Sequence, residues 1–297
     1  MIYDKIMNMF NAIFKEMRIR QWIKNSFVFI PLVFDRQLFT VDSLVRVVLG
    51  FILFCFISSS IYFINDIMDI EADKKHPKKR FRPIASGLIP IPLAWGFAAF
   101  FSLGPIIASL YLSKIFSIIL VTYFVINLAY SLRLKHVALI DVMIIATGFV
   151  LRVGAGVSII VVERFSPWLY VVTTLFALFI GFGKRRGELA TIQVNGNAQR
   201  KVLDGYTIPL LDQLITIVSA TTIIAYSLYT FSAPNLPSNH TMMLTIPLTV
   251  YGIFRYLYLI QVKNEGGAPD ELVLLDRPLQ VTFGLFAISV VIIFYLF

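Results

Sequence analysis

Charge is scarce in this chain. Only 14% of its 297 residues are Asp, Glu, Lys or Arg, whereas soluble domains average about a quarter. Hydrophobic residues make up 58% of the sequence. Because so few charges could not cover a globule with polar surface, the composition excludes an ordinary soluble domain and predicts an integral membrane protein.

Cysteine is almost absent as well. Cys55 is the only cysteine, and it falls within an apolar run. A disulfide framework or a cysteine metal site within one chain needs at least two cysteines, so both are excluded. His76 has no His or Cys neighbours at the spacing of metal ligands, and it indicates no metal site by itself.

Long apolar runs are plentiful, and each is near the roughly 20 residues that cross a bilayer as a helix. Unbroken runs favour helices over a β-barrel, whose strands would show short alternating segments. We therefore predict one all-α membrane domain over residues 1–297. The first run contains Lys24 and Pro31, which would suit a bent or partly interfacial helix. The nine expected spans are 22–37, 44–65, 92–112, 114–130, 138–162, 167–183, 212–231, 242–262 and 279–297.

Lysine and arginine are distributed unevenly between these spans. Twenty of the 26 lie on the side of the N-terminus, and four lie in the opposite loops. The positive-inside rule then predicts that the N-terminus and the two long loops, 65–91 and 184–211, are cytoplasmic. The same bias, with attraction to anionic headgroups, accounts for the net charge of +9. Nucleic-acid binding is not favoured, because no soluble domain presents the bases.

Acidic residues gather where the second span ends, in "INDIMDIEADKKHPKKRFRP" (64–83). On a continuing helix Asp66 and Asp73 lie about 20° apart and Asp69 about 60° from Asp66, so the three carboxylates share one face. Like charges repel, and a divalent cation would remove that conflict. Oxygen ligands suit Mg²⁺, which commonly bridges to phosphate. The pattern predicts a Mg²⁺ site for a diphosphate.

The basic residues after these acids could bind phosphate groups whose charge a metal ion does not neutralise. Arginine holds two phosphate oxygens with its planar guanidinium group, and lysine acts as a point charge. The alternative is a solvated helix end whose acids pair with Lys74, Lys75 and the bases that follow them, or bases that serve only to set the topology. Glu71 points to another face and is expected to be an ordinary ion-pair partner. The candidate phosphate-binding residues here are Lys79, Arg80 and Arg82.

A second group of polar residues surrounds the fifth span. Asp141 and Arg152 are 11 residues apart, about 20° and roughly 16 Å along one helical stripe. Together they would line a pocket that descends into the membrane; the alternative is that Arg152 forms a structural ion pair with another span. Further candidates at the inner membrane edge are Tyr130, Lys135, Lys184, Arg185 and Arg186.

Six short segments stand out together: "NDIMDIEAD" (65–73), "RPIASG" (82–87), "YSLRLK" (130–135), "RQWIKN" (20–25), "GFVLRVGAG" (148–156) and "GKRRGEL" (183–189). In these segments the chain resembles the UbiA superfamily of intramembrane prenyltransferases, and within it the decaprenyl-phosphate phosphoribosyltransferase branch. The resemblance extends over nearly the whole chain. One departure is Ile145, four residues after Asp141, where the wider superfamily often has a second carboxylate.

This resemblance implies a bundle of nine helices around a central cavity, open to the cytoplasm and laterally to lipid, in the bacterial inner membrane. It implies transfer of phosphoribosyl from phosphoribosyl diphosphate to a polyprenyl phosphate, for lipid-linked arabinose of the cell wall. We expect Asn65 to assist the three aspartates at Mg²⁺, and Asp141 to contact the ribose. Lys24 and Arg152 would hold the lipid phosphate.

Two other functions remain open on the sequence. An aromatic prenyltransferase acting on 4-hydroxybenzoate would use the same metal site to ionise a prenyl diphosphate. An anionic solute transporter is less favoured, because transporters tend to bind near the membrane midplane and the acids here lie at one edge. The chain length of the lipid and the formation of oligomers are not determined by the sequence.

Overall fold

The computed structural model describes residues 2–162, 166–195, 201–234, 236–263, 272–273 and 275–296, without the side chains of 2–8, 193–195 and 201. Every regular element in these ranges is helical, which confirms the all-α prediction. Within them, eight helices are long and apolar enough to cross a membrane. They are α3 (Val41–Met68), α5 (Ile91–Ser109), α6 (Lys114–Leu132), α7 (Ile140–Ile159), α8 (Pro167–Asn195), α9 (Ile208–Ser232), α10 (Ile246–Gln261, preceded by η5, Thr241–Thr245) and α12 (Arg277–Leu296).

The chain divides into two compact units. The N-terminal half of α7 belongs to unit 2 and its C-terminal half to unit 1. Unit 1 comprises residues 1–32, 38–132 and 151–161, and unit 2 comprises 33–37, 133–150 and 162–297.

The first expected span, 22–37, is not a single α-helix. It consists of the 3₁₀ segment η1 (Ile19–Phe29) and the short helix α2 (Ile30–Phe34). Pro31 lies in the first turn of α2, where its missing N–H costs nothing. A β-carbon added to Gly156 would come 2.2 Å from the Val28 carbonyl oxygen, so α7 packs against η1 at a position that requires glycine.

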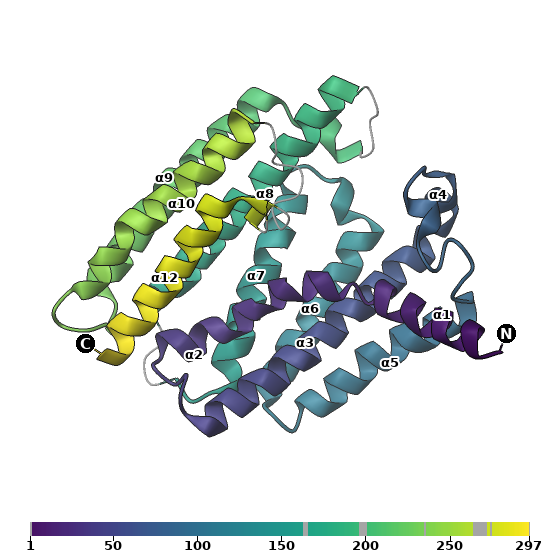
Figure 1. Ribbon diagram of the computed structural model, residues 1–297, viewed down its shortest axis with the longest axis horizontal. Helices are drawn as coiled ribbons and strands as arrows, with labels where there is room; N and C mark the ends of the chain where they lie inside the picture. The colour runs from purple at the N-terminus through teal and green to yellow at the C-terminus, as the bar shows by residue number, and fades with distance from the viewer. Residues whose placement is uncertain are drawn as a thin grey trace. The chain divides into compact units, whose positions relative to one another are not determined.

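In unit 1, η1 runs antiparallel to α3 (Figure 1). The Trp22 indole donates to Ser59 Oγ (3.1 Å), and the Asn25 amide donates to Cys55 Sγ (3.3 Å). The Phe29 ring packs against Phe51, with centroids 5.4 Å apart. In these three contacts the residue numbers rise along η1 while they fall along α3, so η1 follows α3 over several turns.

The helix that carries the acids is interrupted where the sequence predicted continuity. Asp69 (φ −89°, ψ 6°) ends α3 and begins α4 (Ile70–Lys75). Its N–H still donates to the Asn65 carbonyl (2.9 Å), and the Asp73 N–H donates to the Asp69 carbonyl (2.8 Å). Because these bonds preserve the i to i+4 spacing, Asp66 and Asp73 keep a common face despite the break.

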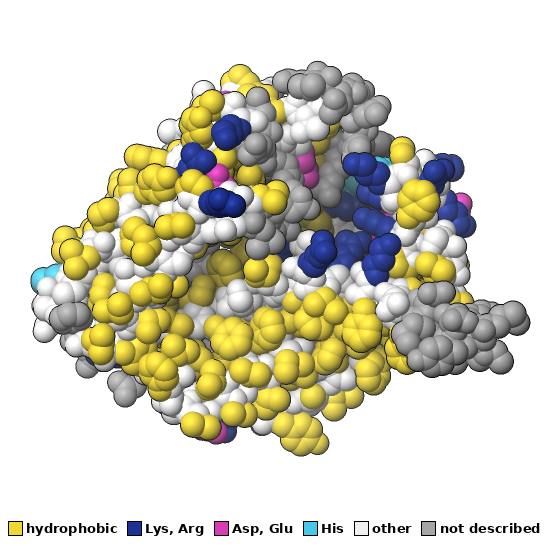
Figure 2. Space-filling view, in the orientation of Figure 1, with side chains coloured by type: hydrophobic (Ala, Val, Ile, Leu, Met, Phe, Trp, Pro, Cys, Tyr) yellow, Lys and Arg dark blue, Asp and Glu magenta, His cyan; other side chains and the backbone are white. Residues whose placement is uncertain are grey.

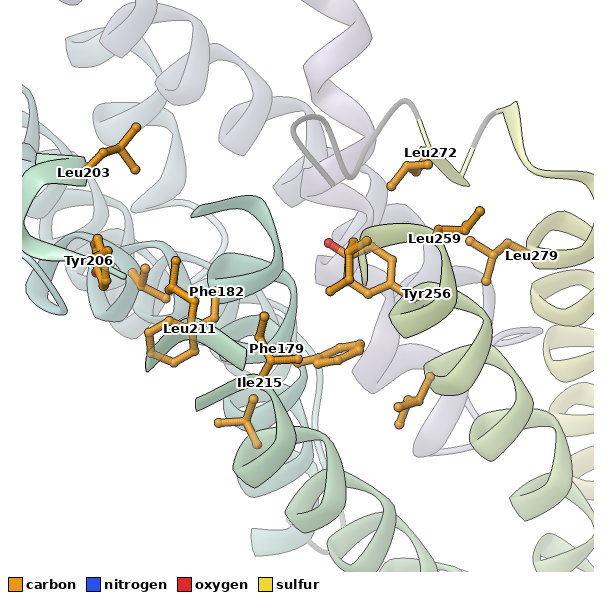
Figure 3. Close-up of a cluster of buried hydrophobic side chains, with 14 of the residues drawn as sticks. Phe179, Phe182, Leu203, Tyr206, Leu211, Ile215, Tyr256, Leu259, Leu272 and Leu279 are labelled. Carbon is orange, nitrogen blue, oxygen red and sulfur yellow. The ribbon is translucent and has the colours of Figure 1, made fainter. Parts of the chain in front are cut away.

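Unit 2 is built on an apolar core between α8, η4 (Lys201–Gly205), α9, α10 and the start of α12. Figure 3 shows the side chains of this core. A β-carbon on Gly183 would lie 2.7 Å from the Tyr256 hydroxyl, so α8 and α10 approach closely there. Asp276 caps α12 by accepting from the Leu279 N–H (3.0 Å), and it also binds Arg255. The core residues labelled in Figure 3 are Phe179, Phe182, Leu203, Tyr206, Leu211, Ile215, Tyr256, Leu259, Leu272 and Leu279.

Large apolar side chains are exposed along the helices, as the yellow surface in Figure 2 shows. On α5, for example, Trp95, Phe100, Leu103 and Ile107 are all exposed. A soluble monomer rarely exposes extended apolar patches, whereas a lipid-facing helix must. The surface therefore agrees with the eight spans in identifying an integral membrane protein.

Candidate functional site

The acidic face at the end of α3 is closed by an arginine of the following loop. Arg82 Nη1 binds Asp73 Oδ2 (2.6 Å) and Asp66 Oδ1 (3.1 Å). The two carboxylates are buried, with exposures of 1% for Asp66 and 2% for Asp73. The structure thus brings two acids of the predicted metal site together with one candidate base, in the ion pairing that the alternative interpretation of this segment predicted.

A second arginine, not singled out from the sequence, binds the same acid. Arg18 follows helix α1 (Ile2–Glu16) in a left-handed conformation (φ 52°). Its Nη2 lies 2.6 and 2.7 Å from the two oxygens of Asp66, and its guanidinium stacks 4.6 Å from the Tyr62 ring centroid. Asp66 therefore joins three segments of unit 1: the end of α1, the end of α3 and the loop after α4.

Glu16, the last residue of α1, is an acid at this cluster that sequence reasoning also missed. Its side chain is 1% exposed, and its carboxyl group lies within hydrogen-bond reach of the Asp66 carboxyl group. Burial, followed by the nearby charge of Asp66, raises the pKa of Glu16 to about 8. Nothing in "FKEMRIRQW" marks this glutamate, because packing of the helix end against α3 brings it inside.

The remaining candidates near α4 have various environments. Asp69 lies half-buried at the junction of α3 and α4, and Asn65 contributes its carbonyl to that junction. Arg80 is exposed and lies over the Phe81 ring at 4.8 Å, while Lys79 is half-buried. The exposed Glu71 pairs with Lys74 (2.9 Å), which confirms its expected role. Figure 2 shows Lys and Arg side chains gathered in the region of α4.

The donor set of this cluster fits a hard divalent cation, since its acids offer only oxygen. Among the described residues, however, no three His, Cys, Asp or Glu side chains converge as a ready-made metal cage. The positive charge next to Asp66 and Asp73 comes from Arg18 and Arg82 instead. We define Glu16, Asp66, Asp73, Arg18 and Arg82 as the acid–arginine cluster.

A separate buried polar group in unit 1 surrounds Arg152 of α7. Arg152 donates to Asn25 Oδ1 (2.8 Å) and to the Tyr123 hydroxyl (2.7 Å), and it lies over the Phe54 ring at 5.6 Å. Its side chain is buried, and Lys24, which precedes Asn25 in η1, is half-buried. The guanidinium group of Arg152, which lies within an expected span, is therefore held by aromatic and amide side chains.

Asp141, expected to line a pocket with Arg152, is instead fixed in unit 2 by Arg185. Arg185 Nε lies 2.6 Å from Asp141 Oδ2, with exposures of 1% and 0% for the two side chains. The Tyr206 hydroxyl donates to Asp141 Oδ1 (2.7 Å), and burial of Tyr206, with this bond, raises the pKa of its phenol. Asp141 therefore forms a buried ion pair with a residue of another span.

The other bases expected near the inner edge of spans four to six also have defined places. Arg186 binds Asp212 (2.7 Å) and the Ile260 carbonyl. Lys184 is half-buried on α8, Lys135 half-buried on η3 (Leu134–His136), and Tyr130 half-buried near the end of α6. The "GKRRGEL" arginines therefore hold α7, α9 and α10 to α8 within unit 2.

Known proteins resemble this chain over most of its length. The profile of the UbiA prenyltransferase family matches residues 35–272. The decaprenyl-phosphate phosphoribosyltransferase of Mycolicibacterium smegmatis is 34% identical over 93% of this chain and 90% of its own length. The enzymes of the same name from Corynebacterium glutamicum (33%, 92% and 84%) and Mycobacterium tuberculosis (31%, 92% and 91%) are similarly related.

Solved structures share the fold. A UbiA homologue from Archaeoglobus fulgidus, bound to DMAPP and Mg²⁺, superposes with a TM-score of 0.73 at 19% identity, covering 96% of this chain and 100% of that one. The same protein bound to GPP and Mg²⁺ gives 0.72 at 19% identity, covering 95% and 99%. The chain therefore belongs to the UbiA prenyltransferase family, in the branch of the decaprenyl-phosphate phosphoribosyltransferases.

Proposed function

We propose that this protein transfers 5-phosphoribosyl from phosphoribosyl diphosphate to a polyprenyl phosphate and releases diphosphate. The relatives named for this reaction are 31–34% identical over at least 92% of the chain. The observation that carries the proposal is the acid–arginine cluster, in which two buried carboxylates are held by two arginines. A substrate with a diphosphate and a 5-phosphate needs both an acid site for a cation and surplus positive charge.

Asp66, Asp69 and Asp73, assisted by Asn65, are the residues that would hold Mg²⁺. When bound, the ion would stabilise the charge that develops on the leaving diphosphate. Arg18 and Arg82 contribute planar forks that fit phosphate oxygens, and Lys79 and Arg80 add charge on the same loop. These bases would bind the substrate phosphates and orient the ribose C1.

In the reaction, the bond from ribose C1 to the diphosphate oxygen breaks, and its electron pair leaves with the diphosphate. An oxygen of the lipid phosphate forms the new bond to C1 from the opposite face. A phosphate monoester is already anionic near neutral pH, so the chain needs no general base for this step. Lys24 and Arg152 are proposed to hold the lipid phosphate. Tyr130, Lys135 and Lys184 stay proposed as further substrate-binding residues. Asp141, Arg185 and Arg186 were expected to bind substrate as well, and we propose instead that their contacts within unit 2 are structural.

Residues 19–34 are proposed as a ninth span. An 11-residue 3₁₀ segment rises about 22 Å and a five-residue α-helix about 7.5 Å, together close to the 30 Å of a bilayer core. The antiparallel pairing with α3 supports this crossing. Nine spans with the observed distribution of bases would place the N-terminus and the acid–arginine cluster in the cytoplasm of a bacterial inner membrane.

The proposal predicts which substrate pair the membranes will use. Membranes that contain the protein should convert labelled phosphoribosyl diphosphate and polyprenyl phosphate into a labelled lipid. The same membranes should give no product from polyprenyl diphosphate and 4-hydroxybenzoate. Membranes without the protein serve as the control. The opposite pattern would overturn the proposal and identify an aromatic prenyltransferase.

A further inference from the structure

Helix α1 is too short to cross the membrane, and it lies across the helices that do. Its 15 residues rise about 22 Å, whereas a bilayer core is about 30 Å thick. Arg18, in the left-handed conformation, separates α1 from η1, so the two segments do not form one continuous helix. Within unit 1, α1 runs across the direction of α3 and α5 (Figure 1). Because those helices pass through the bilayer, a helix across them follows its surface.

One face of α1 packs against the end of α3 and the beginning of α5. Ala12 and Ile13 are buried in one apolar cluster with Phe63 of α3 and Ala94 of α5. Since α5 begins at Ile91, Ala94 belongs to its first turn. These contacts fix α1 at the level where α3 and α5 leave the membrane.

The neighbouring face of α1 exposes two aromatic rings. Phe10 and Phe14 are each more than half exposed, and their spacing of four residues puts them on the same side of the helix. Trp95, in the second turn of α5, is exposed as well. Aromatic side chains are enriched at the boundary between hydrocarbon and headgroups. Both helices therefore expose aromatic rings at the edge of the membrane.

A polar flank of α1 borders a hollow. Asn11 and Lys15 are both exposed and are also four residues apart. The hollow has a volume of about 360 Å³ and lies between α1 and the loop after α4. An ammonium group beside apolar walls suits a ligand that joins an anionic group to an apolar body. The residues that line the hollow are Asn11, Ala12 and Lys15 of α1, and Pro83 and Leu88 of the loop.

We infer that α1 lies in the headgroup layer of the membrane and that this hollow holds the headgroup of an anionic phospholipid. Lys15 supplies a positive charge for the lipid phosphate, and the exposed Arg20 adds another beyond the turn at Arg18. Basic residues on one side and aromatic rings on another are typical of helices that lie in the plane of a membrane. The exposed Leu88 gives the first carbons of the acyl chains an apolar neighbour.

The occupant is a phospholipid of the surrounding bilayer rather than the polyprenyl phosphate of the proposed reaction. Lys15 and Glu16 are consecutive residues of one helix, so their side chains point about 100° apart. The buried Glu16 belongs to the acid–arginine cluster, whereas Lys15 borders the open hollow. The hollow therefore opens on a different face of α1 from the proposed substrate site.

Spin labels measure the depth of α1 in the membrane. Cys55 is the only cysteine and is buried, so a cysteine introduced at the surface can be labelled selectively. In vesicles, a nitroxide on Phe14→Cys should show an oxygen-to-nickel-chelate collision ratio between those of two reference sites. The references are Phe100→Cys, exposed in the middle of α5, and Glu71→Cys, exposed on α4. A ratio equal to that at Glu71 would place α1 in water and overturn the inference.

Binding of phosphatidylglycerol tests the hollow itself. Purified full-length protein in detergent is titrated with short-chain phosphatidylglycerol, and the midpoint of thermal unfolding is followed, because a ligand of the native state raises it. Zwitterionic phosphatidylcholine and inorganic phosphate should give no saturable rise. Lys15→Gln should weaken the apparent affinity about fivefold, the effect expected for one basic residue at an anionic membrane surface. Lys15→Arg, which keeps the charge, should bind like the wild type.

Lys114→Gln is the matched control, because Lys114 is an exposed lysine at the start of α6, beyond the other end of α5. Its affinity for phosphatidylglycerol should stay within about twofold of the wild type. Equal affinities of the wild type and Lys15→Gln would overturn the assignment of the hollow. Weaker binding of polyprenyl phosphate alone in Lys15→Gln would also overturn it, since the hollow would then belong to the acceptor site. Neither experiment measures phosphoribosyl transfer, so failure of this inference leaves the proposed function intact.

Discussion

Replacing Asp66 by Asn should lower the rate of phosphoribosyl transfer by at least about a hundredfold while the protein stays folded. Asp66 is 1% exposed and binds both Arg18 and Arg82, so it is the side chain that organises the acid–arginine cluster. Removing its charge removes a proposed metal ligand and leaves two guanidinium groups misplaced, and losses of this size are typical when electrostatic stabilisation of a transition state is removed. Initial rates with labelled phosphoribosyl diphosphate measure the effect.

Asp42→Asn is the control for this variant. Asp42 lies at the other end of α3, where its side chain is 78% exposed and pairs with Arg46. Its replacement should leave the rate unchanged within about twofold, since exposed ion pairs contribute little. A rate near that of the wild type in Asp66→Asn would show that catalysis does not depend on the carboxylates of α3.

Replacing Arg185 by Met should lower the free energy of unfolding by about 3–5 kcal/mol, the usual cost of leaving a buried charge without its partner. Arg185 and Asp141 are almost completely buried, and the loss of the guanidinium would leave Asp141 with the Tyr206 hydroxyl as its remaining partner in this contact. Denaturant titration in detergent micelles, followed by tryptophan fluorescence, measures the change.

Arg46→Met provides the comparison, because Arg46 makes an exposed i to i+4 pair with Asp42. Its replacement should cost less than about 1 kcal/mol. Equal stability losses in the Arg46 and Arg185 variants would contradict the assignment of Asp141–Arg185 as a structural ion pair. Such a result would favour the direct substrate contact that the sequence suggested for Asp141.

Local spacing was sufficient to predict part of the candidate site. Asp66 and Asp73 are seven residues apart, and two helical turns bring such residues onto one face even though Asp69 interrupts the helix. Arg82 was also expected, because it follows the acids in the same loop. Predictions of this kind succeed when the residues belong to one short segment whose geometry is set by backbone hydrogen bonds.

Contacts between distant segments could not be predicted in the same way. Glu16 and Arg18 reach the cluster because the end of α1 packs against α3, where the Met17 carbonyl accepts from Ser59, more than 40 residues along the chain. Likewise, helical periodicity correctly placed Asp141 and Arg152 on one helix, but it could not show which residues of other helices bind them. Tertiary packing brings Arg185 to Asp141 and Asn25 to Arg152.

The membrane spans were predicted correctly where the sequence has long apolar runs. Eight of the nine expected spans correspond to long apolar helices among the described residues. The exception, 22–37, contains Lys24 and Pro31, and its backbone follows a 3₁₀ path that hydropathy cannot indicate. The segment was the weakest predicted span because of these two residues, and a 3₁₀ helix also rises more per residue than an α-helix.

The central claim is that the protein attaches phosphoribose to a polyprenyl phosphate with the help of a divalent cation. Purified protein in detergent, given ribose-labelled phosphoribosyl diphosphate and polyprenyl phosphate, should transfer label to the organic phase in Mg²⁺. Excess EDTA should abolish the transfer, and added Mg²⁺ should restore it. Transfer that persists at the full rate in EDTA, or an organic phase without label in Mg²⁺, would contradict the account.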